Sequence, residues 1–368
     1  MRRTGRRHVA LTSRLAAQAS LALRRALLAL ADAIVPSQLA LFEQAIGVGR
    51  TQLLHAAARL RLPDLLAGGP RTAAELARST GADEETLFRA LRALAACGVF
   101  RMRRDGRFQN TRLSRAFGSS IAGSMRDFLE YLGSIPNVAA WADLDRTLST
   151  GRSAFERVHG VTVWEWLARH PDDARTFAGA MEGVTELDAP AVAAGYPFGE
   201  LACICDVGGG RGALLEEILV RHPAMRGVLF DAPQVIEDAQ ARLARGGLAG
   251  RIVFVGGSFF ERVPPGCDGY VLKDILHDWD DDAALRILDA CRRAAPPGAR
   301  LIVVEMLVDR RAAVSPAALV DVQMMVATEQ GRQRSAEEHH RLMSRAGLRP
   351  GRVVRLPGAM SLVEGLVV

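Results

Sequence analysis

The spacing of hydrophobic residues changes near residue 200, and the change divides the chain into two parts. Beyond this point apolar runs of strand length start at residues 201, 226, 251, 269 and 300. Helical patterns lie between them, in the stretches 213–222, 235–245 and 283–294. Strands that alternate with helices are typical of a parallel sheet covered by helices on both faces. Residues 352–368 add two strand-like runs around Pro357-Gly358, which predict an antiparallel hairpin at the sheet edge.

The part before residue 200 reads as helices with one small hairpin. Residues 37–65 have helical spacing, a short helix is expected after Thr72, and another is expected from Asp83. The latter carries three apolar residues on one face, Leu87, Leu91 and Leu94. Asp105-Gly106 then marks a turn between two short strands. Two helices followed by a hairpin make a winged-helix pattern.

A winged helix can bind DNA or serve only as a packing module, and these residues leave both interpretations open. Arginines of the second helix and the hairpin could contact phosphates: Arg89, Arg92, Arg101, Arg103, Arg104 and Arg107. However, Lys and Arg total 47 and Lys273 is the one lysine, so arginine is this chain's ordinary surface cation. The single lysine points to a site that needs a compact ammonium, which a planar guanidinium cannot replace.

Length and composition bound the class of protein. A chain of 368 residues with 49% hydrophobic and 24% charged residues is expected to form two globular domains. No apolar run reaches the roughly 18 residues that a membrane span needs. The basic first 36 residues favour an amphipathic helix or a loose extension over an export signal. The five cysteines form no CxxC pair, which predicts free thiols, a cytoplasmic location and no metal site.

The stretch CDVGGGRGALLEEIL follows the first strand and opens a helix. Gly208, Gly210 and Gly212 provide the tight turn and the close ligand approach that a phosphate or nucleotide loop needs. Gly208, Gly210 and Ala213 also fit the pattern of dinucleotide binding. Asp206 precedes the loop, and Asp231 ends the second strand, where a carboxylate can accept hydrogen bonds from ribose hydroxyls. Asp231 therefore indicates a ribose without choosing the cofactor.

Further segments follow the glycine loop in a familiar order: FDAPQVIEDA, VGGSFFERVPPGCDGYVLKDILHDWDDD, LIVVEMLVD and GRQRSAEEHHRLMSRAGL. Over residues 40–368 the chain resembles the caffeic acid and hydroxyindole type of small-molecule O-methyltransferase, including bacterial members that modify natural products. The resemblance implies an α/β Rossmann-like S-adenosylmethionine methyltransferase domain with an N-terminal α-helical winged-helix dimerisation domain. We expect a basic extension over 1–36, the winged-helix domain over 37–135 and the catalytic domain over 136–368. The resemblance also implies a homodimer that binds neither nucleic acid nor membrane.

The same resemblance assigns the cofactor residues. Gly208, Gly210 and Asp231 would bind S-adenosyl-L-methionine. In the segment beside the adenine, Ser258 replaces the family's acid and Phe259 replaces its methionine. The serine hydroxyl can still bond the adenine amine, and the phenyl ring can stack on the base. Lys273 falls on the family's lysine near the cofactor.

His277 is the candidate general base. It lies just beyond the fourth strand, where open α/β sheets bind ligands, and an imidazole suits removal of a phenolic proton. The family's base occupies the same place in LHDW. Glu305 and Gln333 match the two family acids that bracket it, although Gln333 can orient the ring and cannot compensate its charge. The acids 280–282 that follow are expected to be residues of a helix start.

These assignments predict methylation of a phenolic or enolic hydroxyl of a small aromatic or polyketide metabolite. The acceptor pocket is expected to involve Met181, Trp279 and Met324. Three other histidines, His222, His339 and His340, are expected on helix surfaces. Two alternatives remain open: a family member that keeps the cofactor but catalyses hydroxylation or rearrangement, and a winged-helix regulator with a ligand-sensing domain.

Overall fold

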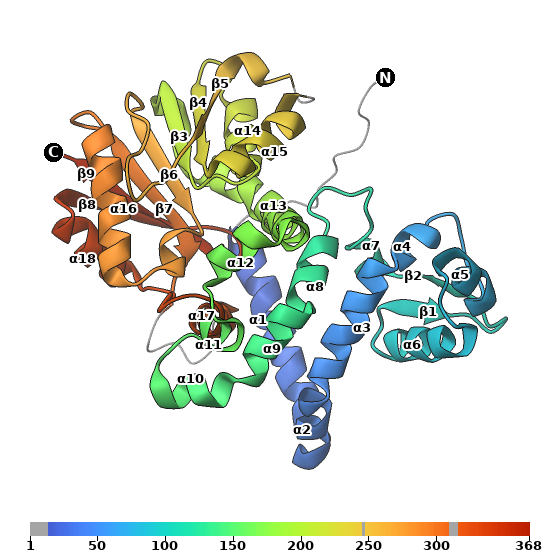
Figure 1. The fold of residues 1–368 in the computed structure, drawn as a ribbon. Coiled ribbons are helices and arrows are strands. Elements are labelled where there is room, and N and C mark those ends of the chain that lie inside the picture. The colour runs from blue at the N-terminus through green and yellow to red at the C-terminus, as the bar shows by residue number, and fades with distance from the viewer. Residues whose placement is uncertain (1–13, 245–246, 309–315) are drawn as a thin grey trace.

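The computed structural model describes residues 14–244, 247–308 and 316–368. Figure 1 shows a helical N-terminal part on one side and a sheet flanked by helices on the other. The N-terminal part contains α1 (Arg14–Ala33), α2 (Ser37–Ala45), α3 (Gly47–Arg59), α4 (Leu62–Leu65), α5 (Ala73–Thr80), α6 (Glu84–Ala96), β1 (Phe100–Met102), β2 (Phe108–Asn110), α7 (Arg112–Arg115) and α8 (Arg126–Leu132).

The predicted pair of helices and its hairpin are confirmed. Thr72 caps α5 and forms a capping box with Glu75, while Asp83 caps α6. Gly81 ends α5 in the left-handed conformation (φ 74°), which turns the chain toward α6. β1 and β2 pair antiparallel, and the three leucines predicted on the inner face of α6 are buried.

A run of helices leads from this part to the sheet. It comprises α9 (Ile135–Ala142), α10 (Leu144–Thr150), α11 (Ala154–His159), α12 (Val163–Arg169) and α13 (Pro171–Gly195). The long helix α13 packs against α8 on one side and α14 on the other, so it joins the two parts mechanically.

The sheet has seven strands, in the order β5-β4-β3-β6-β7-β9-β8. Its elements are β3 (Cys203–Val207), α14 (Ala213–Arg221), β4 (Arg226–Asp231), α15 (Pro233–Leu243), β5 (Ile252–Gly256), β6 (Gly269–Lys273), the 3-10 turn η4 (Leu276–Asp278), α16 (Asp281–Ala294), β7 (Arg300–Met306), α17 (Pro316–Ala327), α18 (Ala336–Arg345), β8 (Leu348–Arg355) and β9 (Met360–Val367). β3 to β7 are parallel and β9 and β8 are antiparallel, so the predicted C-terminal hairpin is confirmed. The direction of the strand order reverses between β3 and β6, which makes their carboxyl ends the expected ligand site.

Alternate residues of each strand face opposite sides of the sheet and build two cores. Ile204 and Leu229 pack with α13, α14 and α15, whereas Cys205 and Phe230 pack with α16 and α18. Because both faces are covered, the strands read as continuous apolar runs rather than alternating ones.

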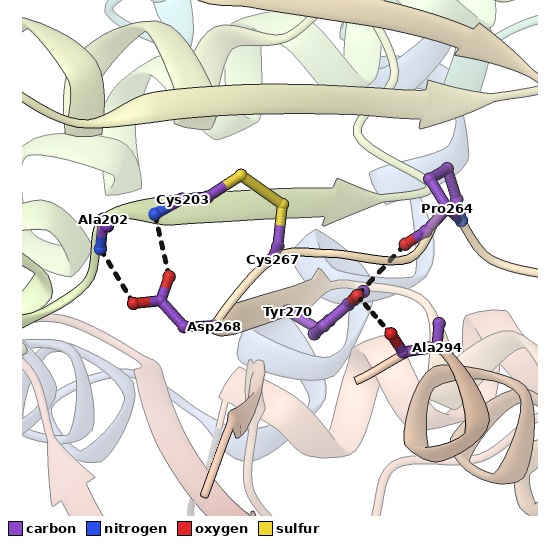
Figure 2. Close-up of a disulfide and its surroundings, with 7 residues drawn as sticks. All are labelled: Ala202, Cys203, Pro264, Cys267, Asp268, Tyr270 and Ala294. Atoms are coloured by element: carbon purple, nitrogen blue, oxygen red, sulfur yellow. Dashed lines mark hydrogen bonds between the residues drawn. A yellow bond between two sulfur atoms is a disulfide. The ribbon is translucent and has the colours of Figure 1, made fainter. Parts of the chain in front are cut away.

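Two cysteines contradict the prediction of free thiols. Cys203 and Cys267 form a disulfide that links the start of β3 to the segment just before β6 (Figure 2). Asp268 reinforces the same place, because its carboxylate accepts the backbone N–H groups of Ala202 and Cys203 at 2.9 and 2.8 Å. The cytoplasmic location stays a prediction, but it loses the support that free thiols gave it.

Within the described ranges no single helix is long and apolar enough to cross a membrane, and only a pair bent by 119°, 19–33 with 37–59, meets the length and composition criteria together.

Candidate active site

The glycine loop after β3 is tightly packed on one side and open on the other. Gly208 and Gly210 have φ of 70° and 56°, a conformation that glycine adopts without strain. A Cβ on Gly208 would lie 2.4 Å from Cδ1 of Ile275. A Cβ on Gly210 would meet nothing within 4 Å among the described residues. The loop therefore presents bare backbone to a space that a ligand can enter.

Two carboxylates border this space. Asp231 accepts the backbone N–H groups of Gly210 (2.8 Å) and Ala232 (2.7 Å), and burial raises its pKa. Asp206 is 1% exposed, and its Oδ2 has no hydrogen-bond partner among the described residues. Burial raises the pKa of Asp206 to about 7. Carboxylate oxygens keep lone pairs after one hydrogen bond, so this arrangement fits a cofactor with ribose hydroxyls and an amino group.

Aromatic residues form the next wall. A Cβ on Gly208 would lie 3.7 Å from the ring of Phe259, which places this ring beside the glycine loop. The ring of Trp279 lies 6.1 Å from that of Phe259 and stacks on Trp164 at 5.8 Å. Trp279, predicted to line the acceptor pocket, therefore packs with Phe259, which is predicted to stack on the adenine. Ser258 is partly buried there and its hydroxyl accepts the N–H of Phe260 at 3.3 Å.

Lys273 ends β6 close to the same loop. It is 8% exposed and forms an ion pair with Asp274. A second carboxylate, that of Asp188 in α13, lies 4.0 Å from its ammonium group. Burial would lower the pKa of Lys273, but these carboxylates raise it, so the ammonium stays charged. The buried lysine thus ties α13 to the sheet edge. Asp274 itself has φ 54°, a strained conformation for a non-glycine residue that is common at functional sites.

We expect Gly210→Ala to weaken S-adenosylmethionine binding by about tenfold, because its methyl group would occupy the open space beside Asp231. Gly298→Ala is the matched control: Gly298 also has positive φ (82°) and free space around its Cβ, but precedes β7 at the opposite sheet edge. Both variants should lose about 1 kcal/mol of stability from the left-handed backbone. Calorimetric titration with the cofactor distinguishes them, and equal affinities for both would contradict the site.

His277 lies in η4, directly beyond β6, and is 8% exposed. Its Nδ1 is 2.7 Å from Nε2 of Gln333, while Oε1 of Gln333 is buried with no hydrogen-bond partner in the described parts of the chain. A half-turn of the amide exchanges the two atoms, so either can face the ring. The structure thus brings together the predicted base and the glutamine predicted to orient it.

Glu305 reaches His277 through the backbone rather than through the ring. Its Oε1 accepts the backbone N–H of His277 at 3.0 Å, and its Oε2 lies 3.2 Å from Nε2 of His339. Burial would raise the pKa of Glu305, but His339, His277 and Arg334 together lower it to about 2. The carboxylate is therefore ionised and directed at the main chain of the turn.

Several acidic side chains near His277 shift the pKa of its imidazole. Its Nε2 lies 3.6 Å from Oδ1 of Asp278. Burial would lower the pKa of His277, but Asp278, Glu305 and Asp274 raise it above the ordinary value. Burial in turn raises the pKa of Asp278 to about 7. The charge states of the base and its neighbouring acid therefore influence each other.

Two residues beside Gln333 were not predicted and hold the turn in place. Arg334 is fully buried and donates to the carbonyls of Leu276 (2.6 Å) and Trp279 (2.7 Å), on either side of His277. A Cβ on Gly331 would lie 2.6 Å from the carbonyl oxygen of His277, so only glycine permits this close approach. Neither residue has a periodic signal in the sequence.

His339 corrects the sequence prediction most clearly. It was expected on a helix surface, but it is 1% exposed, because its face of α18 packs on the sheet. A signal was available: His339, Leu342, Met343 and Ala346 recur at helical spacing and are all buried. A histidine in such a stripe is inside the protein.

The remaining predicted acceptor residues lie in two helices, of which α13 packs against α8 and α17 packs against α9 and α11. Met181 in α13 and Met324 in α17 are both partly buried. The rings of Tyr131 and Phe177 pack edge to face with centroids 5.2 Å apart, and Phe177 packs on Trp164 at 6.0 Å. Burial raises the pKa of Tyr131 to about 12, so it stays a neutral phenol.

Comparison with protein families gives two matches. A sequence model of the O-methyltransferase domain matches residues 141–349, and one of the O-methyltransferase dimerisation domain matches residues 42–120. The dimerisation match covers the winged-helix pattern. The acids, glycines and histidine described above all fall within the methyltransferase match.

Individual relatives span nearly the whole chain. Phenazine O-methyltransferase PhzM of Lysobacter antibioticus is 37% identical over 330 residues, which is 90% of this chain and 96% of that protein. Mitomycin biosynthesis 6-O-methyltransferase of Streptomyces lavendulae is 38% identical over 304 residues, 82% and 86% of the two chains. A relative named 8-amino-8-demethylriboflavin N,N-dimethyltransferase, from Streptomyces davaonensis, is 35% identical over 299 residues, 80% and 85% of the two chains.

Solved structures agree with these relatives. The structure of LaPhzM superposes with a TM-score of 0.88 at 36% identity, covering 91% of this chain and 100% of that one. Human N-acetylserotonin methyltransferase in complex with SAM gives 0.84 at 26% identity, covering 90% and 98%. The family uses S-adenosylmethionine, and the residues around the glycine loop fit it. The chain therefore belongs to the S-adenosylmethionine-dependent O-methyltransferases, with a dimerisation domain preceding the methyltransferase domain.

Proposed function

We propose that this enzyme methylates a phenolic or enolic hydroxyl of a small aromatic natural product, with His277 as the general base. One observation carries the proposal: the buried His277 lies at the carboxyl edge of the sheet with its Nδ1 engaged by Gln333 at 2.7 Å. Since one ring nitrogen is held by the protein, the other is available to an acceptor.

The tautomer decides whether His277 can act as a base. With Oε1 of Gln333 turned toward the ring, Nδ1–H donates to the amide oxygen and Nε2 keeps its lone pair. We assign this orientation to the reactive state. Nε2 then takes the acceptor's proton, and the resulting imidazolium is stabilised by Asp278 on the same side of the ring.

The bound cofactor would supply an electrophilic methyl carbon, to which the acceptor oxygen bonds in line as the carbon–sulfur bond breaks and the sulfur leaves as a neutral thioether. The protein contributes alignment and the exclusion of water, and these account for much of such a rate. Gly208 and Gly210 would hold the cofactor close to the sheet, while Asp231 would bond its ribose. Phe259 and Trp279 would enclose its adenine, and Lys273 would fix the neighbouring edge of the site through Asp188.

The acceptor is tested directly with isotopically labelled S-adenosylmethionine and a panel of phenols, enols and aromatic amines of similar size. We expect label transfer to a hydroxyl. Amines belong in the panel because the relatives include both O- and N-methyltransferases. Label transfer only to amines would contradict a hydroxyl acceptor and indicate an amine instead. Cofactor binding without any methyl transfer would favour the non-methylating alternative.

We also propose that the enzyme is a homodimer and that α1 enlarges its interface. α1 precedes the matched dimerisation domain, and nearly all of its described side chains are exposed. Leu23, Leu27 and Leu30 form a stripe on one face, 61%, 57% and 59% exposed. An isolated helix is only marginally stable in water, so such a stripe needs an apolar partner. The exposed apolar surface continues through Phe42 and Ile46 into the dimerisation domain.

Replacing the three stripe leucines of α1 with serine should raise the dimer dissociation constant by about 100-fold, because each leucine loses at least about 1 kcal/mol of burial. In the control variant serine replaces Ala22, Ala29 and Ala33, which are exposed on another face of α1. The control loses as much helix propensity as the leucine variant. Analytical ultracentrifugation measures both. An unchanged association of the leucine variant would remove α1 from the interface.

A further inference from the structure

The turn that carries His277 is held by a buried carboxylate, and that carboxylate is held by a histidine with no assigned role. Glu305 Oε1 accepts the backbone N–H of His277 at 3.0 Å. Glu305 Oε2 lies 3.2 Å from Nε2 of His339, and both side chains are 0% exposed. The two contacts place one carboxylate between the backbone of the base and the ring of a second histidine from α18.

A buried carboxylate needs more than one hydrogen bond. Leaving Oε2 of Glu305 without a donor would favour protonation or rotation of the carboxyl, and either change would disturb the bond from Oε1 to the His277 backbone. Oε2 of Glu305 and Nε2 of His339 lie 3.2 Å apart, and neither atom has another hydrogen-bond partner among the described residues. At this distance an Nε2–H of His339 is placed to act as the second donor that a charged, fixed Glu305 needs.

We propose that His339 is a positioning residue for methyl transfer: it donates Nε2–H to Glu305, which thereby holds the backbone of His277 at the distance that Gln333 and the acceptor require. The proposal rests on the proposed role of His277 as base. His339 touches neither cofactor nor acceptor and acts through Glu305 alone.

The neutral Gln333 makes this backbone support more important. A carboxylate at that position would attract an imidazolium by charge as well as by hydrogen bonding, whereas an amide supplies only the hydrogen bond. The location of the His277 ring then depends on how firmly its main chain is held. Arg334 bonds the carbonyls on either side of His277, and Glu305 bonds the N–H between them.

Other charged groups surround this pair and will contribute to any pH profile. His277 faces Asp278, Glu305, Asp274 and Lys273, and Glu305 faces His339, His277 and Arg334. The test therefore compares variants that change the hydrogen bond of His339 while they leave all these groups in place.

Two amide substitutions distinguish the roles of the two ring nitrogens of His339. Gln places an amide N–H near the position of Nε2, and Asn places one near Nδ1. We expect His339→Gln to keep kcat within about threefold of the wild type, and His339→Asn to lower kcat by about tenfold or more. KM for the acceptor and the calorimetric affinity for S-adenosylmethionine should change by less than about twofold in both. His340→Asn, one residue along α18, is the matched control and should match the wild type.

A double-mutant cycle tests whether His339 acts through Glu305. In a Glu305→Gln background, His339→Asn should lower kcat by less than about twofold further, because the carboxylate it supports is gone. The same loss in both backgrounds would overturn the proposal. Equal kcat values for the Gln and Asn variants would also overturn it. So would a large loss of kcat in His339→Gln, if circular dichroism and cofactor binding show that this variant is folded.

The outcome is separable from that of the proposed function. If His277→Ala retains full turnover, the general-base role fails, whatever the His339 variants do. If His277→Ala is inactive while His339→Asn has normal kcat and a normal pH profile, only the positioning role is lost. If His339→Asn does not fold, a kcat for His339→Gln more than tenfold below the wild type overturns the proposal, and one within threefold supports it.

Discussion

Replacement of His277 by alanine is expected to lower kcat for methyl transfer to a phenol by about 10²- to 10⁴-fold, the usual contribution of a positioned general base. The imidazole is buried and held through Nδ1, so no bulk water can replace its role at the same distance. Affinity for S-adenosylmethionine should be unchanged, because the predicted cofactor contacts come from other residues. Steady-state kinetics and calorimetry measure the two effects independently.

The control for this substitution is His340→Ala, which removes an imidazole from α18 outside the site. It should leave kcat unchanged. A His277→Ala enzyme that retains full kcat at neutral pH would show that alignment alone drives the reaction and that the phenol reaches the site already ionised.

The pH dependence follows from the same group. The pKa of His277 is raised, and the base form exists only above that pKa, so kcat should rise with pH through a midpoint above the ordinary 6.5. Asp278, with a pKa of about 7, interacts with His277, so the rise belongs to the pair. In His277→Ala this limb should disappear. A midpoint at or below 6.5 in the wild type would contradict the assignment.

Arg334→Ala should destabilise the protein by about 3 kcal/mol or more. The substitution leaves the carbonyls of Leu276 and Trp279 without their donor in a buried site, where each unsatisfied group costs about 1–3 kcal/mol. It also removes one of the two arginine partners of Asp281 and opens a cavity where a fully buried side chain stood. Urea unfolding should show the loss, and any folded fraction should have a lower kcat because the turn of His277 is released.

The neighbouring Arg332 provides a matched control. It pairs with the same Asp281 at 3.1 Å and with Glu338 at 3.0 Å, but its side chain is 35% exposed. Exposed ion pairs contribute little, so Arg332→Ala should cost less than about 1 kcal/mol. Comparable losses for the two arginines would mean that the buried carbonyl bonds of Arg334 are unimportant.

Much of the fold could be predicted because local patterns and global structure agree. The change of hydrophobic period located the sheet, Asp83 and Thr72 marked helix starts, and Pro357-Gly358 located the terminal hairpin. The glycine loop and His277 were found because each follows an apolar run that forms a strand, and parallel strands bring their carboxyl ends to one edge.

The parts that escaped prediction depend on which strands and loops become neighbours. Cys203 and Cys267 pair because β3 lies beside β6, a crossover that no local pattern specifies. The ring of His277 contacts Gln333 rather than Glu305, because the side chain of Glu305, near the end of β7, is directed at the backbone N–H of His277. Arg334 is surrounded by polar sequence, yet it is fully buried, because the carbonyls it binds lie in another segment.

The disulfide has a consequence for handling the enzyme. Cys203 and Cys267 are 64 residues apart, and cyclising that length of chain removes disorder from the unfolded ensemble worth about 4 kcal/mol. Dithiothreitol in a storage buffer would restore that disorder without touching a single group at the cofactor edge, which lies at the other end of β3. A reduced preparation could therefore bind cofactor normally when fresh and still lose activity during a long incubation, through unfolding rather than through chemistry.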